Sequence, residues 1–170
     1  MFNNILDLAQ RHERAIVGCL RDLIAIRSVS AQEGDVIRRI EREMAACGYD
    51  EVRIDAMGNI LGRIGSGPHI VALDAHVDTV DVGNPANWAV DPFAGAERDG
   101  IVYGRGACDM KGALASIVYG GRIVKELGLA RDCTLWVVGS VQEEDCDGLC
   151  WQYILNEGGL SPEAVVIAEP

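Results

Sequence analysis

The chain has 170 residues and a mass of 18.3 kDa, about the size of one domain. Hydrophobic residues make up 49% of it and charged residues 24%, which is enough apolar surface for a core and excludes intrinsic disorder. The net charge of −11 would be repelled by phosphate backbones and anionic membranes, so we expect neither nucleic acid nor a membrane as a partner.

The N-terminal segment and the cysteines bear on the cellular compartment. Residues 1–14 contain Asp7 and Glu13 and lack the apolar run of a secretory signal, and no stretch is long enough for a membrane span. We therefore expect a cytoplasmic protein whose six cysteines stay thiols. Cys146 and Cys150 lack the spacing of a metal-binding pair and no second pair answers them, so we interpret them as structural.

The first third of the chain predicts two helices and a hairpin. Apolar residues recur at helical spacing over residues 5–26, which indicates an amphipathic helix. Ser30 and Glu33 have the spacing of a capping box for a second helix that Gly48 can terminate. Residues 52–54 alternate in polarity, and a turn at Gly58-Asn59 leads into residues 60–64, so these segments predict a β-hairpin.

The rest of the chain alternates strands and helices. Apolar runs at 70–75, 133–141 and 164–168 predict three buried strands, and helical patterns cover 113–127 and 149–156. This order predicts an α/β fold, with a mixed, largely parallel sheet flanked by helices. About thirty residues between Thr79 and Cys108 are too many for a routine loop, so we expect them to be functional, with a hairpin at Asp99-Gly100.

Polar residues that could carry chemistry follow each of the three predicted parallel strands. In such sheets ligands bind beyond the carboxyl ends of the strands. A histidine and a carboxylate two residues apart can also be held together, with the carboxylate orienting the imidazole; the alternative for this pair is a purely structural contact. The residues expected at this edge are His76, Asp78, Asp109, Glu143, Glu144 and Glu169.

The acidic residues of this set each have an ordinary alternative. Glu143 and Glu144 are adjacent, so that one could bind a metal while the other acts as a general base, or both could belong to a solvated acidic loop. Asp109 lies in a glycine-rich approach to a helix and could be a helix cap. A phosphate-binding loop is excluded there, because that motif needs glycine directly before lysine and this chain has Met110.

Taken together, one imidazole and several carboxylates suit zinc, with cobalt or manganese as substitutes. Two ions are favoured over one, because a shared carboxylate can hold a pair of ions that activates a water and polarises a carbonyl group. The sequence therefore predicts a metal-dependent hydrolase site.

The same segments resemble the metallopeptidase family that includes carboxypeptidase G, aminoacylase, acetylornithine deacetylase and succinyl-diaminopimelate desuccinylase. The resemblance runs through the successive signatures at residues 76–80, 91–93, 104–112, 143–144 and 169–170. Residues 80–85 and 141–151 are similar to a subgroup described as selenium-metabolism-linked hydrolases.

The resemblance implies a role for each site residue. Asp109 would bridge two zinc ions, His76 and Glu169 would complete one of them, and Glu144 would bind the other. Glu143 would be the catalytic base and Asp78 would orient His76. The family also implies a cis peptide between Asp109 and Met110, and hydrolysis of an amide bond in a small peptide or an N-acyl amino acid.

The resemblance covers only the first part of the family's chain. Residues 1–170 would be the N-terminal part of the catalytic domain, without the lid or dimerisation domain and without the C-terminal return that supplies a further histidine ligand. We therefore expect the full-length protein to be a hydrolase and a homodimer, and this piece alone to be inactive or nearly so. The alternative is a truncated remnant that serves as a metal-binding or interaction module.

Overall fold

The computed structural model describes residues 1–146 and 148–170. Its centre is a five-stranded sheet in the order β1-β2-β6-β3-β7. Strand β3 pairs in parallel with β6 and with β7, whereas β2 pairs antiparallel with β1 and with β6. The mixed, largely parallel sheet is thus confirmed. The strands are β1 (Glu51–Ile54), β2 (Ile60–Gly65), β3 (His69–His76), β6 (Cys133–Ser140) and β7 (Ala164–Ile167).

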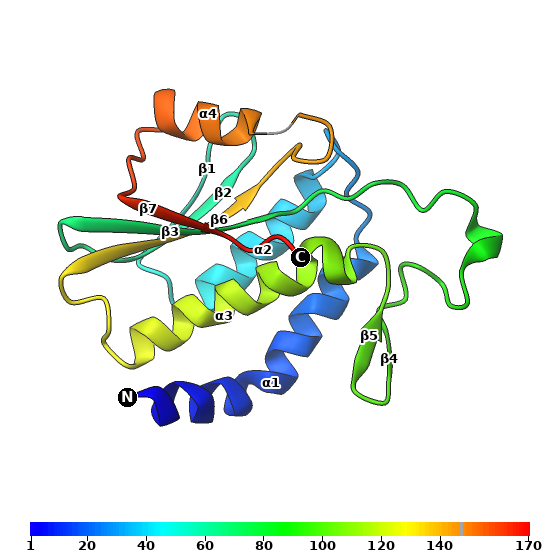
Figure 1. Cartoon of the computed structure of the whole chain (residues 1–170), viewed down its shortest axis with the longest axis horizontal. Coiled ribbons are helices and arrows are strands. Elements are labelled where there is room, and N and C mark those ends of the chain that lie inside the picture. Colours follow the sequence, from blue (N-terminus) through cyan, green and yellow to red (C-terminus); the bar gives the residue numbers. More distant parts are fainter. Residues whose placement is uncertain (147) are drawn as a thin grey trace.

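Four helices flank this sheet in two layers. Helices α1 (Phe2–Ala25), α2 (Gly34–Ala46) and α3 (Gly112–Glu126) lie on one face, and α4 (Leu149–Asn156) lies on the other (Figure 1). Each helix agrees with its predicted range to within a few residues. No helix among the described residues is both long and apolar enough to span a lipid bilayer.

The two layers bury two separate apolar clusters, because successive residues of a strand point to opposite faces of the sheet. Val137 packs in the larger cluster with the side chains of α1, α2 and α3. Its neighbour Val138 packs in the smaller cluster with Trp136 and with Ile154 of α4. Side chains therefore cover both faces of the sheet at β6 and β3, the strands whose C-terminal ends precede the polar residues singled out in the sequence.

The β1–β2 hairpin forms where the sequence predicts it. The Oδ1 atom of Asp55 accepts hydrogen bonds from the backbone N–H groups of Met57, Gly58 and Asn59, at 2.9–3.0 Å. Gly58 has a φ of 109°, a conformation that favours glycine because a Cβ atom would be strained there. A side chain and a glycine together close the turn.

The predicted capping box is wrong, although α2 begins and ends near the expected residues. The N-cap residue of α2, Glu33, makes no side-chain capping bond. Its Oε1 atom accepts instead from the backbone N–H of Gln142, while the hydroxyl of Ser30 donates to Asp78. Both side chains therefore form hydrogen bonds with residues that follow β6 and β3, and not with the first turn of α2. Gly48 follows α2 with a φ of 77°, as predicted.

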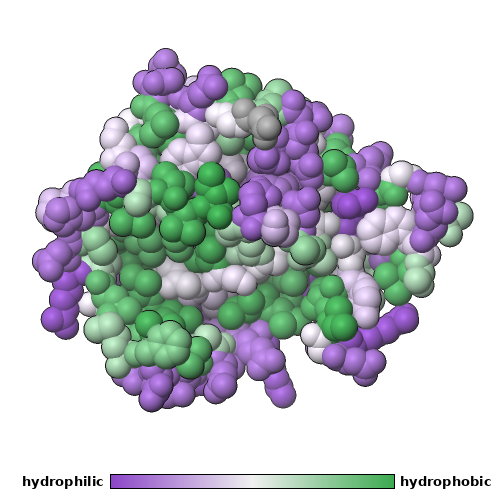
Figure 2. All heavy atoms as spheres, viewed as in Figure 1, coloured by the Kyte–Doolittle hydropathy of each residue, from purple (hydrophilic) through white to green (hydrophobic). Residues whose placement is uncertain are grey.

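The prediction of a third buried strand is also wrong in one respect. Strand β7 is parallel to β3, but all four of its residues are exposed, with Val166 at 55% and Ile167 at 57%. It is an edge strand that pairs with β3 alone in the described sheet, and neither helix layer covers its side chains. They form part of the hydrophobic surface seen in Figure 2.

The long segment between β3 and α3 extends away from the body of the molecule (Figure 1). It contains one turn of 3₁₀ helix at Pro85–Asn87, a separate hairpin of β4 (Ala96–Arg98) and β5 (Ile101–Tyr103), and a short irregular helical stretch, Ala107–Lys111, that leads into α3. Asp99 and Gly100 form the two-residue turn, with φ values of 52° and 76°, which confirms the predicted hairpin.

Candidate metal centre

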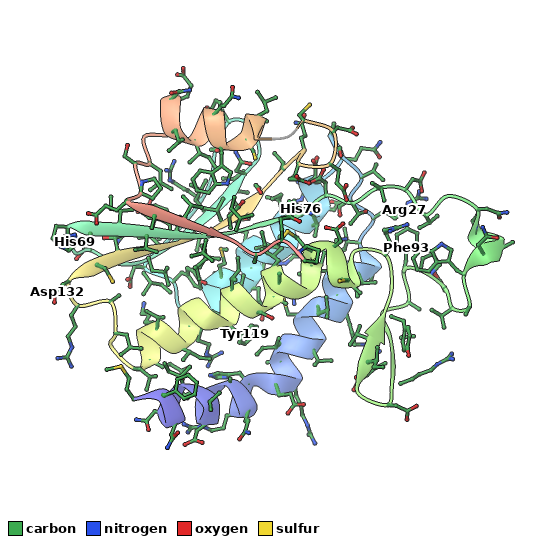
Figure 3. The ribbon with its side chains drawn as sticks, viewed as in Figure 1. Arg27, His69, His76, Phe93, Tyr119 and Asp132 are labelled. Atoms are coloured by element: carbon green, nitrogen blue, oxygen red, sulfur yellow. The ribbon has the colours of Figure 1, made fainter. Side chains whose placement is uncertain are left out.

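The polar residues that follow the parallel strands do meet at one edge of the sheet. His76 is the last residue of β3 and lies opposite Ser140, the last residue of β6. Glu143 and Glu144 come shortly after β6, and Glu169 comes shortly after β7. Figure 3 shows His76 at the site end of β3 and His69 at the other end. Parallel pairing therefore brings these segments together, as the sequence predicts.

His76 is the centre of this cluster. Its side chain is 1% exposed. The Nδ1 atom lies 2.9 Å from the backbone carbonyl oxygen of Asp78 and 3.4 Å from the carboxylate of that residue. The Nε2 atom lies 2.9 Å from Asp109 Oδ1 and 3.8 Å from carboxylate oxygens of both Glu143 and Glu169. One ring nitrogen is thus fixed by Asp78, and the other faces three carboxylates.

The acidic surroundings decide the protonation of His76. Burial lowers the pKa of the imidazole, but hydrogen bonds to Asp78 and Asp109 and the negative charges of Asp78 and Glu143 outweigh burial and raise the pKa from 6.5 to about 9. Positive charge at Nε2 is therefore favoured. At neutral pH and without a bound metal ion, the imidazole of His76 is protonated.

Asp78 holds two segments of the site together. The carboxylate is fully buried and accepts hydrogen bonds from the backbone N–H groups of Glu143, at 3.1 Å, and Glu144, at 3.2 Å. The hydroxyl of Ser30 donates to it at 2.6 Å. Burial raises the pKa of Asp78, but the contact with His76 and these three hydrogen bonds lower it by more, so that the net pKa is below 3.8. Asp78 therefore fixes the turn that carries both glutamates.

The candidate ligand atoms form two overlapping groups, each within 4.8 Å. One contains His76, Glu143 and Glu169, and the other contains His76, Asp109 and Glu144. All four predicted ligands and the predicted base are thus in one place. The grouping pairs Glu143 with Glu169, whereas the resemblance gives Glu143 a proton-transfer role. The assignment of each residue to one ion or the other stays a prediction.

The donor set fits a divalent metal ion. Two ligands of one zinc ion can lie up to about 4.2 Å apart, twice the usual bond length, and the separations of 2.9 Å and 3.8 Å from His76 Nε2 are within that limit. Among the described residues, the ion pairs of Asp109 and Glu169 lead to His76 and to no lysine or arginine. The surplus negative charge at this edge is what a metal ion would neutralise.

The glycines before Asp109 are explained by close packing. A Cβ atom on Gly104 would collide with Ile24 of α1 and lie 2.9 Å from the carbonyl oxygen of Pro92. Gly106 has a φ of 78°, and a Cβ atom there would lie 2.7 Å from the side chain of Thr79. These glycines let the loop approach α1 and the end of β3. The Asp109–Met110 peptide is cis, as the resemblance implies.

The cysteines lie outside the candidate ligand groups that the described residues form. All six are free thiols in the structure. Cys150 is buried, and burial raises the pKa of its thiol to about 11. Cys146 is half-buried.

Sequence reasoning missed three contributors to this site. Ser30 donates to Asp78 across 48 positions of the chain, and the backbone N–H of Val80 donates to Glu144 at 3.2 Å. Lys111 lies in the family signature at residues 104–112, and its Nζ atom donates to the carbonyl oxygens of Leu23 and Ile26. Nothing in the local sequence distinguishes Ser30 from a capping residue, and Lys111 carries no signal for a partner on α1.

Comparison with known proteins adds to this geometry. The sequence pattern of Peptidase family M20/M25/M40 matches residues 72–170, which include every residue of the candidate site. The chain belongs to this family. The resemblance seen in the sequence is thereby confirmed at the level of the family, whereas the finer similarity to selenium-metabolism-linked hydrolases stays a prediction.

Two curated proteins illustrate the similarity in sequence. The uncharacterized protein YgeY of Escherichia coli K12 is 52% identical over 169 residues, which cover 99% of this chain and 42% of that protein. A succinyl-diaminopimelate desuccinylase of Parvibaculum lavamentivorans is 34% identical over 134 residues, or 75% of this chain and 34% of that protein. The chain therefore spans less than half the length of these relatives.

A solved structure supports the fold. The YXEP protein of Bacillus subtilis, described as a dinuclear metal binding peptidase from the M20 family, matches with a TM-score of 0.69 at 18% identity. The match covers 93% of this chain and 43% of that one. At this identity the similarity establishes the shared α/β architecture.

Proposed function

We propose that these residues form the metal site of a hydrolase that cleaves an amide bond in a small peptide or an N-acyl amino acid. The observation that carries the proposal is the position of His76 Nε2, 2.9–3.8 Å from carboxylates of Asp109, Glu143 and Glu169, which come from three separate segments. We propose two zinc ions, with cobalt or manganese as substitutes, and His76, Asp109, Glu144 and Glu169 as ligands.

Glu143, His76 and Asp78 have different roles in the proposed hydrolysis. Bound divalent ions would supply an activated water and polarise the substrate carbonyl. Glu143 accepts a proton from the attacking water and passes it to the departing amine, so that the products are a carboxylate and an amine. His76 presents Nε2 because Nδ1 is held by the carbonyl oxygen of Asp78. Asp78 also holds the backbone of Glu143 in place.

The substrate class rests on the relatives. A desuccinylase among them removes an acyl group, and the neighbour described as a peptidase cleaves peptide bonds. Both support an amide or peptide as substrate. The cytoplasmic location and the homodimer of the full-length protein stay predictions.

Metal retention tests the site directly. The purified 170-residue chain is dialysed against zinc and then against metal-free buffer, and zinc is measured by elemental analysis. We expect about one to two ions per chain, and a loss of at least one in Asp109→Ala. Asp35→Ala is the matched control, because Asp35 is 77% exposed and pairs only with Arg38 among the described residues. No retained zinc in the parent chain would contradict the proposed site.

Hydrolysis tests the chemistry. We propose that this chain alone releases little amine from N-acyl amino acids and dipeptides, because the resemblance places a further histidine ligand outside it. Amine release is measured with the zinc-loaded chain and with Glu143→Gln. Fast release that Glu143→Gln abolishes would support the hydrolase and contradict the predicted inactivity. Measurable release at the same rate in both chains would contradict the role of Glu143.

A further inference from the structure

The segment between α1 and α2, residues 26–33, touches every segment that carries a candidate ligand except the one after β7. We propose that this segment, the α1–α2 connector, is a positioning element that sets the spacing of the metal ligands, with Ser30, Glu33 and the buried Lys111 as its contact residues. The inference rests on the proposed metal site and assigns a role to residues outside the ligand set.

The first contact is with the end of β3. The hydroxyl of Ser28, which is 1% exposed, donates to the carbonyl oxygen of Val77 at 2.8 Å. The carbonyl oxygen of Ser28 accepts from the N–H of Thr79 at 2.9 Å. The hydroxyl of Ser30 then reaches the carboxylate of Asp78 at 2.6 Å. Three consecutive residues after His76 are thus bonded to the connector.

The second contact is with the turn after β6. The carboxylate of Glu33 is buried and accepts from the backbone N–H of Gln142 at 2.9 Å. Gln142 has a φ of 57°, in the left-handed region that few residues other than glycine adopt. A bond that stabilises this conformation also directs the next two residues, Glu143 and Glu144, toward Asp78.

The third contact is with the turn that carries Asp109. Lys111 is 1% exposed, and its Nζ atom donates to the carbonyl oxygens of Ile26 at 2.8 Å and Leu23 at 2.9 Å. These carbonyls lie at the C-terminal end of α1, where the helix dipole attracts a cation. Met110 is fully buried, whereas the carboxylate of Asp109 is 53% exposed beside His76. The backbone that directly follows Asp109 is therefore anchored, while the side chain of Asp109 faces the site.

The connector also has a contact that we expect to matter little. The guanidinium of Arg27 lies 5.2 Å from the centre of the Phe93 ring (Figure 3) and 3.3 Å from Asp81, but its side chain is 61% exposed. Exposed ion pairs of this kind contribute little because solvent screens them. Arg27 therefore provides a control on the same connector.

One short segment thus fixes three parts of the chain that are far apart in sequence. Metal affinity depends on how closely the ligand atoms converge, and side chains that hold ligands in place typically change it about 10- to 100-fold when removed. Loss of a buried connector contact should therefore weaken metal binding even when all ligands are present.

Metal titration of connector variants tests this role. Zinc and, separately, cobalt are titrated into the apo chain by calorimetry, and the visible absorption of the cobalt form is recorded. We expect Lys111→Met to weaken zinc binding about 10- to 100-fold and to change the cobalt spectrum, since the Asp109 side is no longer anchored. Ser30→Ala should weaken binding in the same direction. Lys125→Met is the matched control, because Lys125 is 41% exposed and pairs with Asp50.

The other variants separate the explanations. Tyr49→Phe removes a buried hydrogen bond to the carbonyl oxygen of Val118, away from the site, and should lower stability without changing metal affinity. Arg27→Ala should bind zinc as the parent does. A folded Lys111→Met chain with parental affinity and spectrum would overturn the inference; if that variant does not fold, parental affinity in Ser30→Ala overturns it. No binding by the parent would instead overturn the metal site itself, and the inference with it.

Discussion

Replacing Asp78 by asparagine is the sharpest test of which contacts hold the residues of the candidate metal site in place. The substitution keeps the size of the side chain and removes its charge. In the native chain, Oδ1 accepts from the N–H of Glu143, and Oδ2 accepts from the N–H of Glu144 and the hydroxyl of Ser30. Whichever oxygen becomes an amide nitrogen then faces a backbone N–H, so at least one donor is left unpaired in a buried site.

The size of the effect follows from these contacts. A hydrogen bond to a charged group contributes about 1.5–3 kcal/mol, and a buried donor left unpaired costs about 1–3 kcal/mol. We therefore expect Asp78→Asn to lower the free energy of unfolding by about 2–4 kcal/mol. For a chain of this length that corresponds to a fall in Tm of roughly 4–16 °C. Zinc affinity should also fall, by about 10- to 100-fold, because Asp78 holds His76 and the turn with Glu143.

Urea denaturation of the apo chain and calorimetric titration with zinc measure the two effects. Asp35→Asn is the matched control, because Asp35 is exposed and should change stability by less than about 0.5 kcal/mol. The reasoning about the buried carboxylate would be refuted if Asp78→Asn were as stable as Asp35→Asn and bound zinc as the parent does.

The same residue predicts a pH dependence. The pKa of Asp78 is lower in the folded chain than its ordinary value of 3.8. The stability that it contributes is therefore present above about pH 4 and is lost as the pH falls through the folded pKa. We expect the difference in unfolding free energy between the parent and Asp78→Asn to shrink below pH 4. A difference that is constant from pH 7 to pH 3 would contradict this.

Two further predictions concern packing and thiol chemistry. Gly121→Ala places a Cβ atom against the hydroxyl of Tyr49 and 2.8 Å from its ring carbon Cζ, so urea denaturation should show a loss of about 1–3 kcal/mol. In a Tyr49→Phe background the loss should be smaller, and a purely additive double variant would argue against this contact. A thiol reagent at pH 8 should modify exposed Cys108 in the fastest phase, and persistence of that phase in Cys108→Ser would contradict the assignment. Slow reaction is expected of the buried thiols, whose pKa values burial raises to about 11–12: Cys19, Cys47 and Cys150.

The elements with strong periodic patterns could be predicted from the sequence. Helix α3 and strand β6 have long apolar faces, and the parallel order of β3, β6 and β7 follows from alternating strands and helices. The convergence of His76 and Glu143 was predictable for the same reason, because residues that follow parallel strands meet at one edge.

Features that depend on distant partners could not be predicted. Ser30 and Glu33 satisfy a local capping rule, yet their hydrogen bonds go to Asp78 and Gln142, 48 and 109 positions away. The exposure of Val166 depends on which side chains cover β7, and an apolar run has the same composition in a covered strand as in an edge strand. Local sequence patterns predict helices, strands and turns. They do not specify which distant residues a side chain will contact in the folded chain.

The scattered origin of the site has a consequence for folding. His76 and Asp109 are 33 residues apart, and β2 must pair with β6 across a much longer stretch, from Gly65 to Thr134 at the nearest pair, so long loops close before the ligand set exists. An unfolded chain holds these side chains too far apart to share one ion. A divalent ion that binds this set therefore binds the native chain alone, and at 100 times its Kd it adds about 2.7 kcal/mol to the free energy of unfolding. Metal occupancy at this edge would thus report on completion of the whole sheet.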